Sequence, residues 1–254
     1  MIIRKAVAEI ERMGRAGVVV ADTLALIGER ARPGVTTGEL DALADEFIRS
    51  QGGVPTFKGY RGYPASICTS PNDMVVHGIP GRYSLEEGDV LSVDVGVTLE
   101  GFVADSAYTF PIGEVSADAE RLLEGCQAAL DAGIEQCRVG NHLSDISHAI
   151  QRGTEARGFS VVRSLVGHGV GRAMHEEPQI PNFGAPGRGP LLSTGMTFAI
   201  EPMINAGESD VVLHEDQWSI STADGSLSAH YEHTVAITDE GPRILTPRKT
   251  TVRT

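Results

Sequence analysis

The feature that most constrains this chain of 254 residues is that its second half repeats the first at a nearly constant offset. Arg32-Pro33-Gly34 matches Arg138-Val139-Gly140, 106 residues later (140 − 34 = 106), and the same offset pairs Gly52 with Gly158. The segment Gly88–Asp94 likewise matches Gly195–Glu201 at an offset of 107 (201 − 94 = 107). Such a chain is expected to fold as two similar halves, about 1–112 and 113–254, related by a pseudo-twofold axis.

Each half is predicted to contain two helices followed by strands. Helices are expected around 5–31 and 117–137, and each precedes one of the repeated segments. Thr36 and Glu39 have the spacing of a capping box, and apolar residues follow at helical spacing. This order predicts an α+β fold. Because no low-complexity linker separates the halves, we expect one domain spanning 1–254, with Gly184–Pro190 as a surface loop.

Composition excludes several classes of protein. The net charge of −13 argues against nucleic acid as the main partner, because phosphate contacts need a cationic face. Three cysteines without Cys-x-x-Cys spacing indicate reduced thiols. The N-terminus has no signal-peptide core, and the longest early apolar stretch, Val18–Ala21, is too short to cross a membrane. We therefore expect a cytoplasmic enzyme without a membrane or specific nucleic-acid partner.

Four acidic residues lie at matched places in the strands of the two halves. Asp94 and Glu201 end the repeated strand, whose apolar residues are predicted to lie on one face and whose acid is predicted to lie on the other. A later strand of each half carries Asp105 or Glu232. If the halves pair about a twofold axis, these carboxylates converge. The repulsion between two ionised carboxylates about 4 Å apart is roughly 4 kcal/mol at an effective dielectric of about 20. A single strand Asp is more often a turn or edge residue than a ligand. The joint pattern, however, favours a dinuclear hydrolytic centre, in which two divalent cations neutralise four charges.

Histidines complete the pattern. His168 lies between two glycines, which would let the backbone approach a metal or would simply mark a bulge. His175 follows seven residues later, and His77 is its counterpart in the first half. Three further histidines are interpreted as ordinary surface or core residues: His142, His148 and His214.

Five strings of the sequence closely resemble type I methionine aminopeptidases. They are Asn72–Pro80, Val93–Gly96, Gly167–Pro178, Gly195–Met203 and Leu227–Thr234. The resemblance extends from the first helix to Leu245. It implies the pita-bread fold, a duplicated α+β arrangement in which helices cover a curved antiparallel sheet with pseudo-twofold symmetry.

The resemblance also implies the roles of the polar residues. Two divalent ions (Co, Mn, Fe or Zn) would be held by Asp94, Asp105, His168, Glu201 and Glu232, with Asp105 and Glu232 bridging. A hydroxide between the metals would attack the first peptide bond, with Glu201 as general base. His175 would hydrogen-bond the developing oxyanion, and His77 would contact the peptide near the leaving nitrogen.

The substrate implied by the resemblance is the initiator methionine of nascent proteins and peptides with a small second residue. Its side chain needs an apolar, polarizable pocket, whose walls by resemblance are Phe57, Tyr60, Tyr63, Cys68, Met174 and Trp218. Many bacterial relatives carry other residues at Phe57, Val76, Leu165 and Met174. These departures affect the shape of the pocket and none of the metal ligands.

Two other functions stay open at the level of sequence. Enzymes that cut Xaa-Pro bonds share the fold and metal set but usually carry an extra N-terminal domain, and none fits before His77. Binding modules of this fold have lost their ligands, whereas all five are intact here. The basic residues Arg243, Arg248, Lys249 and Arg253 either dock transiently on the ribosome or form a solvated tail, and we expect the tail. We expect a monomer.

Overall fold

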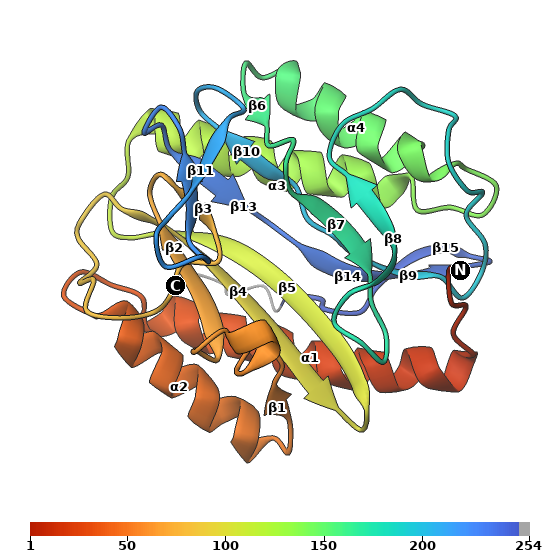
Figure 1. Cartoon of the computed structure of the whole chain (residues 1–254), viewed down its shortest axis with the longest axis horizontal. Coiled ribbons are helices and arrows are strands. Elements are labelled where there is room, and N and C mark those ends of the chain that lie inside the picture. Colours follow the sequence, from red (N-terminus) through yellow and green to blue (C-terminus); the bar gives the residue numbers. More distant parts are fainter. Residues whose placement is uncertain (249–254) are drawn as a thin grey trace.

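A computed structural model describes residues 1–248 of the chain (Figure 1). Its four α-helices are α1 (Val7–Arg30), α2 (Thr37–Ser50), α3 (Ala117–Glu135) and α4 (Leu143–Glu155), and a short 3₁₀ turn covers Tyr60–Gly62. All four lie where the sequence predicts helices. The first residues of α2 and α4 are 106 positions apart (143 − 37 = 106), which is the offset of the sequence repeat.

The described residues contain fifteen strands. In the first half they are β1 (Val54–Pro55), β2 (Ile67–Pro71), β3 (Met74–Val76), β4 (Val90–Leu99) and β5 (Phe102–Pro111). In the second half they are β6 (Ser160–Val161), β7 (Val166–Gly169), β8 (Glu176–Pro181), β9 (Thr197–Ile200), β10 (Met203–Asn205), β11 (Val211–Leu213), β12 (Ile220–Thr222), β13 (Ser228–His230), β14 (His233–Thr238) and β15 (Gly241–Ile244).

The strands form antiparallel ladders that lie between the two pairs of helices. One ladder joins β1, β4 and β2, with β5 on β4, and another runs β15-β14-β9-β7-β8. Smaller ladders run β13-β10-β6 and β11-β12-β3. Figure 1 shows α1 and α2 on one side of the strands and α3 and α4 on the other. The predicted α+β pita-bread fold is confirmed, although its sheet is divided into four ladders. Within the described part of the chain, no helix is long and apolar enough to cross a bilayer.

Capping interactions explain where the second helix of each half begins. The Glu39 backbone N–H donates to Thr36 Oγ1 (3.2 Å), and the Thr36 N–H donates to the Glu39 carboxylate (2.7 Å). At the equivalent place in the second half, the His142 N–H donates to the Asp145 carboxylate (2.7 Å). Both carboxylates lie in the first turn, where the helix leaves N–H groups unpaired. The predicted capping box is confirmed.

Each helix pair packs on one face of its strands and leaves the other face for polar side chains. Leu91 and Val93 of β4 lie in the core beneath α1 and α2. Phe198 and Ile200 of β9 lie in the core beneath α3 and α4. Because side chains alternate along a strand, Asp94 lies on the opposite face of β4. The sequence predicted this alternation in both halves.

The halves are joined along β5 and the β13–β14 segment. The Thr234 hydroxyl accepts from the Asp105 N–H (3.0 Å) and lies 2.8 Å from the Asp105 carboxylate. The Glu232 N–H donates to the Ala107 carbonyl (3.0 Å), and the Thr109 hydroxyl donates to the His230 carbonyl (2.9 Å). These buried bonds fix the register of one half against the other.

The two basic C-terminal residues that are described, Arg243 and Arg248, have different surroundings. Arg243 forms an ion pair with Glu11 (2.6 Å). The Arg248 guanidinium lies 4.1 Å from the ring centroid of Tyr108 and 5.1 Å from that of Tyr231. Our expectation of a solvated tail is therefore wrong for Arg248, which packs against two aromatic rings, whereas Arg243 in β15 is exposed to solvent. Lys249 and Arg253 lie outside the described residues.

Packing of α1 against the C-terminal segment predicts different effects for two glycines of this helix. A Cβ atom at Gly17 would lie 1.9 Å from the Leu245 carbonyl oxygen, whereas one at Gly14 would meet only the end of the Arg243 side chain, at 3.9 Å. We expect Gly17→Ala to lower the free energy of unfolding by about 1–3 kcal/mol. Gly14→Ala should leave it unchanged or raise it by up to about 1 kcal/mol. Urea denaturation measures both, and equal stability of the two variants would contradict this packing.

Candidate active site

A cavity of about 300 Å³ lies between the two halves and is lined by every side chain that the sequence analysis assigned to the site. They are Phe57, Tyr60, Tyr63, Cys68, His77, Asp94, Asp105, His168, Met174, His175, Glu201, Trp218 and Glu232. Arg61, Val76, Ser164, Leu165, Val166 and Met203 complete the lining. The two predicted groups, acidic and apolar, therefore share one pocket.

Strand geometry brings the carboxylates together. Asp94 lies on β4 and Asp105 on its partner β5, where Asp105 is opposite Gly96. Glu201 directly follows β9, and Glu232 lies between β13 and β14. Ligand atoms of Asp105, His168 and Glu232 lie within 4.8 Å of one another, and Glu201 Oε1 is 3.4 Å from His168 Nε2. The convergence that the sequence predicted is present.

Among the described residues, no Lys or Arg side chain forms an ion pair with the four carboxylates of the pocket. The Gly169 carbonyl lies 2.9 Å from His168 Nδ1. Because a carbonyl oxygen only accepts, the proton of neutral His168 is on Nδ1, and Nε2 keeps its lone pair. That lone pair faces Asp105 Oδ2 (3.5 Å) and Glu201 Oε1 (3.4 Å), which are also acceptors. Asp94 Oδ1 and Asp105 Oδ2 are buried without a hydrogen-bond partner. Converging buried lone pairs of oxygen and one imidazole nitrogen are a set of donors that fits divalent cations.

Burial and mutual repulsion perturb these carboxyls. Burial raises the pKa of Asp105 to about 6. Burial, together with repulsion from neighbouring carboxylates, raises the pKa of Asp94, Glu201 and Glu232 well above their ordinary values. In the protein without cations, protons relieve part of the repulsion, whereas bound cations would displace them.

The imidazoles of the pocket are neutral at neutral pH. The pKa of His77, His168 and His175 is lowered to about 4, mainly by burial and, for His77 and His175, also by a neighbouring imidazole. A neutral imidazole has one N–H donor and one lone pair, so it can act either as a ligand or as a hydrogen-bond donor.

The glycines around His168 allow neighbouring strands to pack closely. A Cβ atom at Gly167 would lie 2.5 Å from the Ala199 carbonyl oxygen, and one at Gly169 would lie 2.3 Å from the Glu177 carbonyl oxygen. The register of β7 on β8 shifts between His168 and Gly169. The interpretation as a β-bulge is therefore correct, and the bulge directs the imidazole into the pocket.

Aromatic rings form part of the lining of the same pocket. The Trp218 ring meets Tyr63 edge-on at 5.1 Å and His77 at 6.5 Å between ring centroids. His77 has a φ of 60°, which is unusual for a residue other than glycine and is typical of functional positions. Phe57 fills the space over Gly96, since a Cβ there would lie 2.6 Å from its ring.

One imidazole near the site received no role from the sequence. His230 is buried, and its Nε2 lies 3.8 Å from Glu201 Oε2 without a hydrogen-bond partner. Its spacing in the sequence could have indicated a place near the site. His230 and Glu232 are two residues apart, so they share one side of an extended chain.

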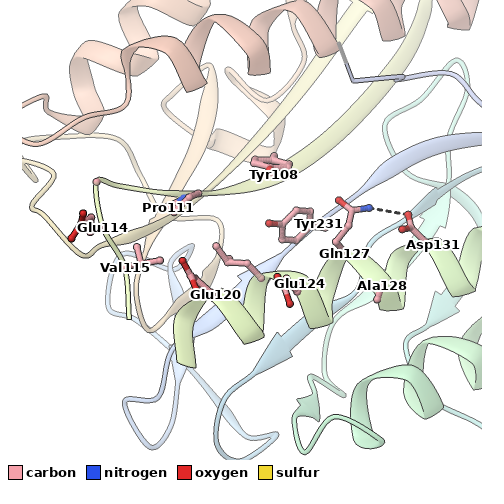
Figure 2. A pocket seen from close by; sticks show the side chains of 12 residues that line it. Tyr108, Pro111, Glu114, Val115, Glu120, Glu124, Gln127, Ala128, Asp131 and Tyr231 are labelled. Carbon is pink, nitrogen blue, oxygen red and sulfur yellow. Dashed lines mark hydrogen bonds between the residues drawn. The ribbon is translucent and has the colours of Figure 1, made fainter. Parts of the chain in front are cut away.

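A second hollow of about 900 Å³ lies between α3 and the end of β5 (Figure 2). Glu120 and Glu124 line it along α3, with Tyr108 and Tyr231 across from them. Its carboxylates are exposed, and no histidine or cysteine lines it. The residues that could hold a metal ion and the buried acids and bases therefore lie in the smaller cavity, which is the candidate active site.

Comparisons with known proteins identify the family of the chain. The profile of Metallopeptidase family M24 matches residues 11–239. The chain is 53% identical to a methionine aminopeptidase of Clostridium perfringens over 246 residues, which is 97% of this chain and 99% of the relative. The crystal structure of methionine aminopeptidase from Rickettsia prowazekii superposes with a TM-score of 0.96 at 42% identity, covering 97% of this chain and 100% of that one. A prolidase from Pyrococcus horikoshii shares the fold alone, with a TM-score of 0.79 at 18% identity, and this chain covers 65% of it.

Proposed function

We propose that this chain, which belongs to metallopeptidase family M24 and within it to the methionine aminopeptidases, removes N-terminal methionine from polypeptides by hydrolysing their first peptide bond. The observation that carries the proposal is the shared pocket, which buried carboxylates and histidines line together with aromatic side chains. The decisive assay offers Met-Ala and Ala-Pro peptides to the purified protein with Mn, Fe, Co or Zn. Cleavage of Ala-Pro peptides alone would refute the proposal.

We propose two divalent cations as cofactors, held by Asp94, Asp105, His168, Glu201 and Glu232. Two dications balance the four carboxylate charges, and the unpartnered oxygens of Asp94 and Asp105 support this stoichiometry. Asp105 and Glu232 are the proposed bridging ligands. When bound, divalent cations of this kind polarise the scissile carbonyl and lower the pKa of water.

The remaining chemistry is assigned to side chains of the pocket. Glu201 is the proposed general base, which takes a proton from the attacking water and delivers it to the leaving nitrogen. His175 donates a hydrogen bond to the developing oxyanion, and His77 contacts the peptide near the leaving nitrogen. Their neutral state supports these roles, because neutral imidazoles do not repel the cations.

The aromatic wall is the proposed binding site for the methionine side chain. Tyr63 and Trp218 meet edge to face, and Phe57, Cys68 and Met174 are buried beside them. A closed apolar surface of this kind suits a flexible thioether. We expect the preference for a small second residue to arise on the side of the pocket near His77, where the cleft is crowded.

The proposed substrates are the N-termini of nascent chains, with the protein acting as a cytoplasmic monomer. All three cysteines are buried free thiols, which supports a reducing compartment. A transient contact with the ribosome would bring the enzyme to such substrates.

Removal of either proposed bridging carboxylate tests the metal site. We expect Asp105→Asn and Glu232→Gln each to lower metal affinity and kcat/KM by at least about 100-fold, more than the roughly 10–100-fold loss typical of partners outside the ligand set. Metal titration by calorimetry and elemental analysis measure this. Glu124→Gln, in the exposed hollow of Figure 2, is the matched control and should bind metal normally. A metal-free preparation with full activity would refute the metal site.

The two histidines outside the ligand set should separate catalysis from metal binding. His77→Ala and His175→Ala are each expected to lower kcat by roughly 10²–10³, the loss typical for one positioned transition-state donor. Metal content should be nearly unchanged in both. Either variant isolated with less metal than wild type would identify that histidine as a ligand.

A matched peptide series tests specificity. Burial of the methionine side chain is worth roughly 1.5–3 kcal/mol, so an alanine at position one should lower kcat/KM by about 10–100-fold. At position two, Ala and Gly should be accepted, and Leu and Lys hardly at all. Phe57 and Met174 are expected to alter tolerance for norleucine at position one without altering the rule at position two. Equal turnover of Ala-first and Met-first peptides would contradict the methionine pocket and leave the aminopeptidase assignment intact.

A further inference from the structure

Two neighbouring histidines of the pocket have different partners on Nδ1. His168 Nδ1 lies 2.9 Å from the Gly169 carbonyl oxygen. His175 Nδ1 lies 2.9 Å from the Tyr60 hydroxyl. The two imidazole centroids are only 4.3 Å apart, so both rings face the same polar region. The partner of Nδ1 therefore decides whether Nε2 of each imidazole offers a lone pair or an N–H donor to this polar region.

A neutral imidazole carries its proton on one nitrogen, and a hydrogen bond at the other selects which. The carbonyl at His168 requires Nδ1–H and leaves Nε2 with a lone pair, as a metal ligand needs. A phenol can do the opposite, because its O–H group can donate to the lone pair of Nδ1. The proton of His175 is then on Nε2, and the ring presents an N–H donor.

The contacts around Tyr60 favour donation by its hydroxyl. The bond to His175 is the one hydrogen bond of this hydroxyl among the described residues, and an imidazole nitrogen is a stronger acceptor than a phenol oxygen. The Tyr60 ring is also stacked on His175, with centroids 5.4 Å apart and planes 28° apart. The hydroxyl is thus held against Nδ1 by both packing and hydrogen bonding.

Both partners are anchored from outside the pocket. Tyr60 lies in a tight turn between Gly59 (φ 87°) and Arg61 (φ 49°). The loop that carries His175 is fixed through Glu176, whose carboxylate accepts from the Arg172 N–H (2.8 Å) and pairs with buried Lys5 (2.5 Å). The geometry of the pair is therefore set before substrate binds.

We propose that Tyr60 is a positioning residue that fixes the tautomer of His175 with the proton on Nε2. His175 then serves as a hydrogen-bond donor to substrate instead of a further metal ligand. The inference rests on the proposed role of His175 in the hydrolysis, and it extends the part of Tyr60 beyond the wall of the methionine pocket.

Nitrogen-15 NMR of the histidine rings tests the tautomer directly in the zinc-loaded protein, because zinc is diamagnetic. The His175 signals are assigned by their loss in His175→Gln. In wild type we expect a protonated Nε2 and a hydrogen-bonded, unprotonated Nδ1. In Tyr60→Phe, which keeps the ring, the Nδ1 signal should lose the shift caused by its hydrogen bond, and a second tautomer should become populated. A wild-type proton on Nδ1 would overturn the inference.

Kinetics with a matched control separate positioning from structure. Tyr60→Phe should lower kcat by roughly 5–10-fold on a Met-Ala peptide, the effect of losing one neutral hydrogen bond, with little change in KM. Tyr63→Phe is the control, because its hydroxyl donates to the Gly78 carbonyl (2.9 Å) and should leave the His175 spectrum unchanged. Equal loss of kcat in both variants without a change in that spectrum would refute the role of Tyr60. Failure of the wild type to cleave Met-Ala would instead refute the proposed function, whatever the tautomer.

Discussion

Four carboxyl groups lie in one buried pocket, and the need to neutralise them is the constraint on which the rest of the structure depends. Two unit charges about 4 Å apart repel by roughly 4 kcal/mol even at an effective dielectric of about 20. The structure responds with raised pKa values for Asp94, Glu201 and Glu232 and with a hydroxyl, from Thr234, on Asp105. Divalent cations are the remaining means of neutralising these charges. Membership of a metallopeptidase family is consistent with the use of such cations.

The four carboxylates come from both halves of the chain. Asp94 and Asp105 come from the first half and Glu201 and Glu232 from the second, so neither half has a complete site. The pocket exists because β5 and the β13–β14 segment are joined by buried bonds, including that from the Glu232 N–H to the Ala107 carbonyl. A shift of one residue along this seam would turn a carboxylate away from the pocket, because side chains alternate along a strand. The duplication thus matters for function as well as for folding.

The histidines show how surroundings assign chemistry to identical side chains. His168 and His175 lie side by side and are both neutral, yet a backbone carbonyl contacts one Nδ1 and a phenol hydroxyl contacts the other. Replacing the carbonyl oxygen by a phenol hydroxyl as the partner of Nδ1 is enough to turn Nε2 from an acceptor with a lone pair into an N–H donor. The aromatic wall adds selectivity by packing, with Tyr63 and Trp218 held edge to face.

The sequence alone determined the duplication, the four helices and the alternation that puts Asp94 opposite a buried face, because periodicity and capping are local properties. It also indicated the acidic and apolar side chains of the pocket, through their matched places and through resemblance. It gave no role to His230 and misjudged Arg248, since each depends on partners more than 25 residues away, Glu201 and Tyr108. The sequence also left open why glycines flank His168. The close contacts of Gly167 and Gly169 with neighbouring strands, seen only in the structure, explain why no side chain fits there. Such distances and hydrogen-bond partners arise when remote segments pack together, and no local pattern encodes them.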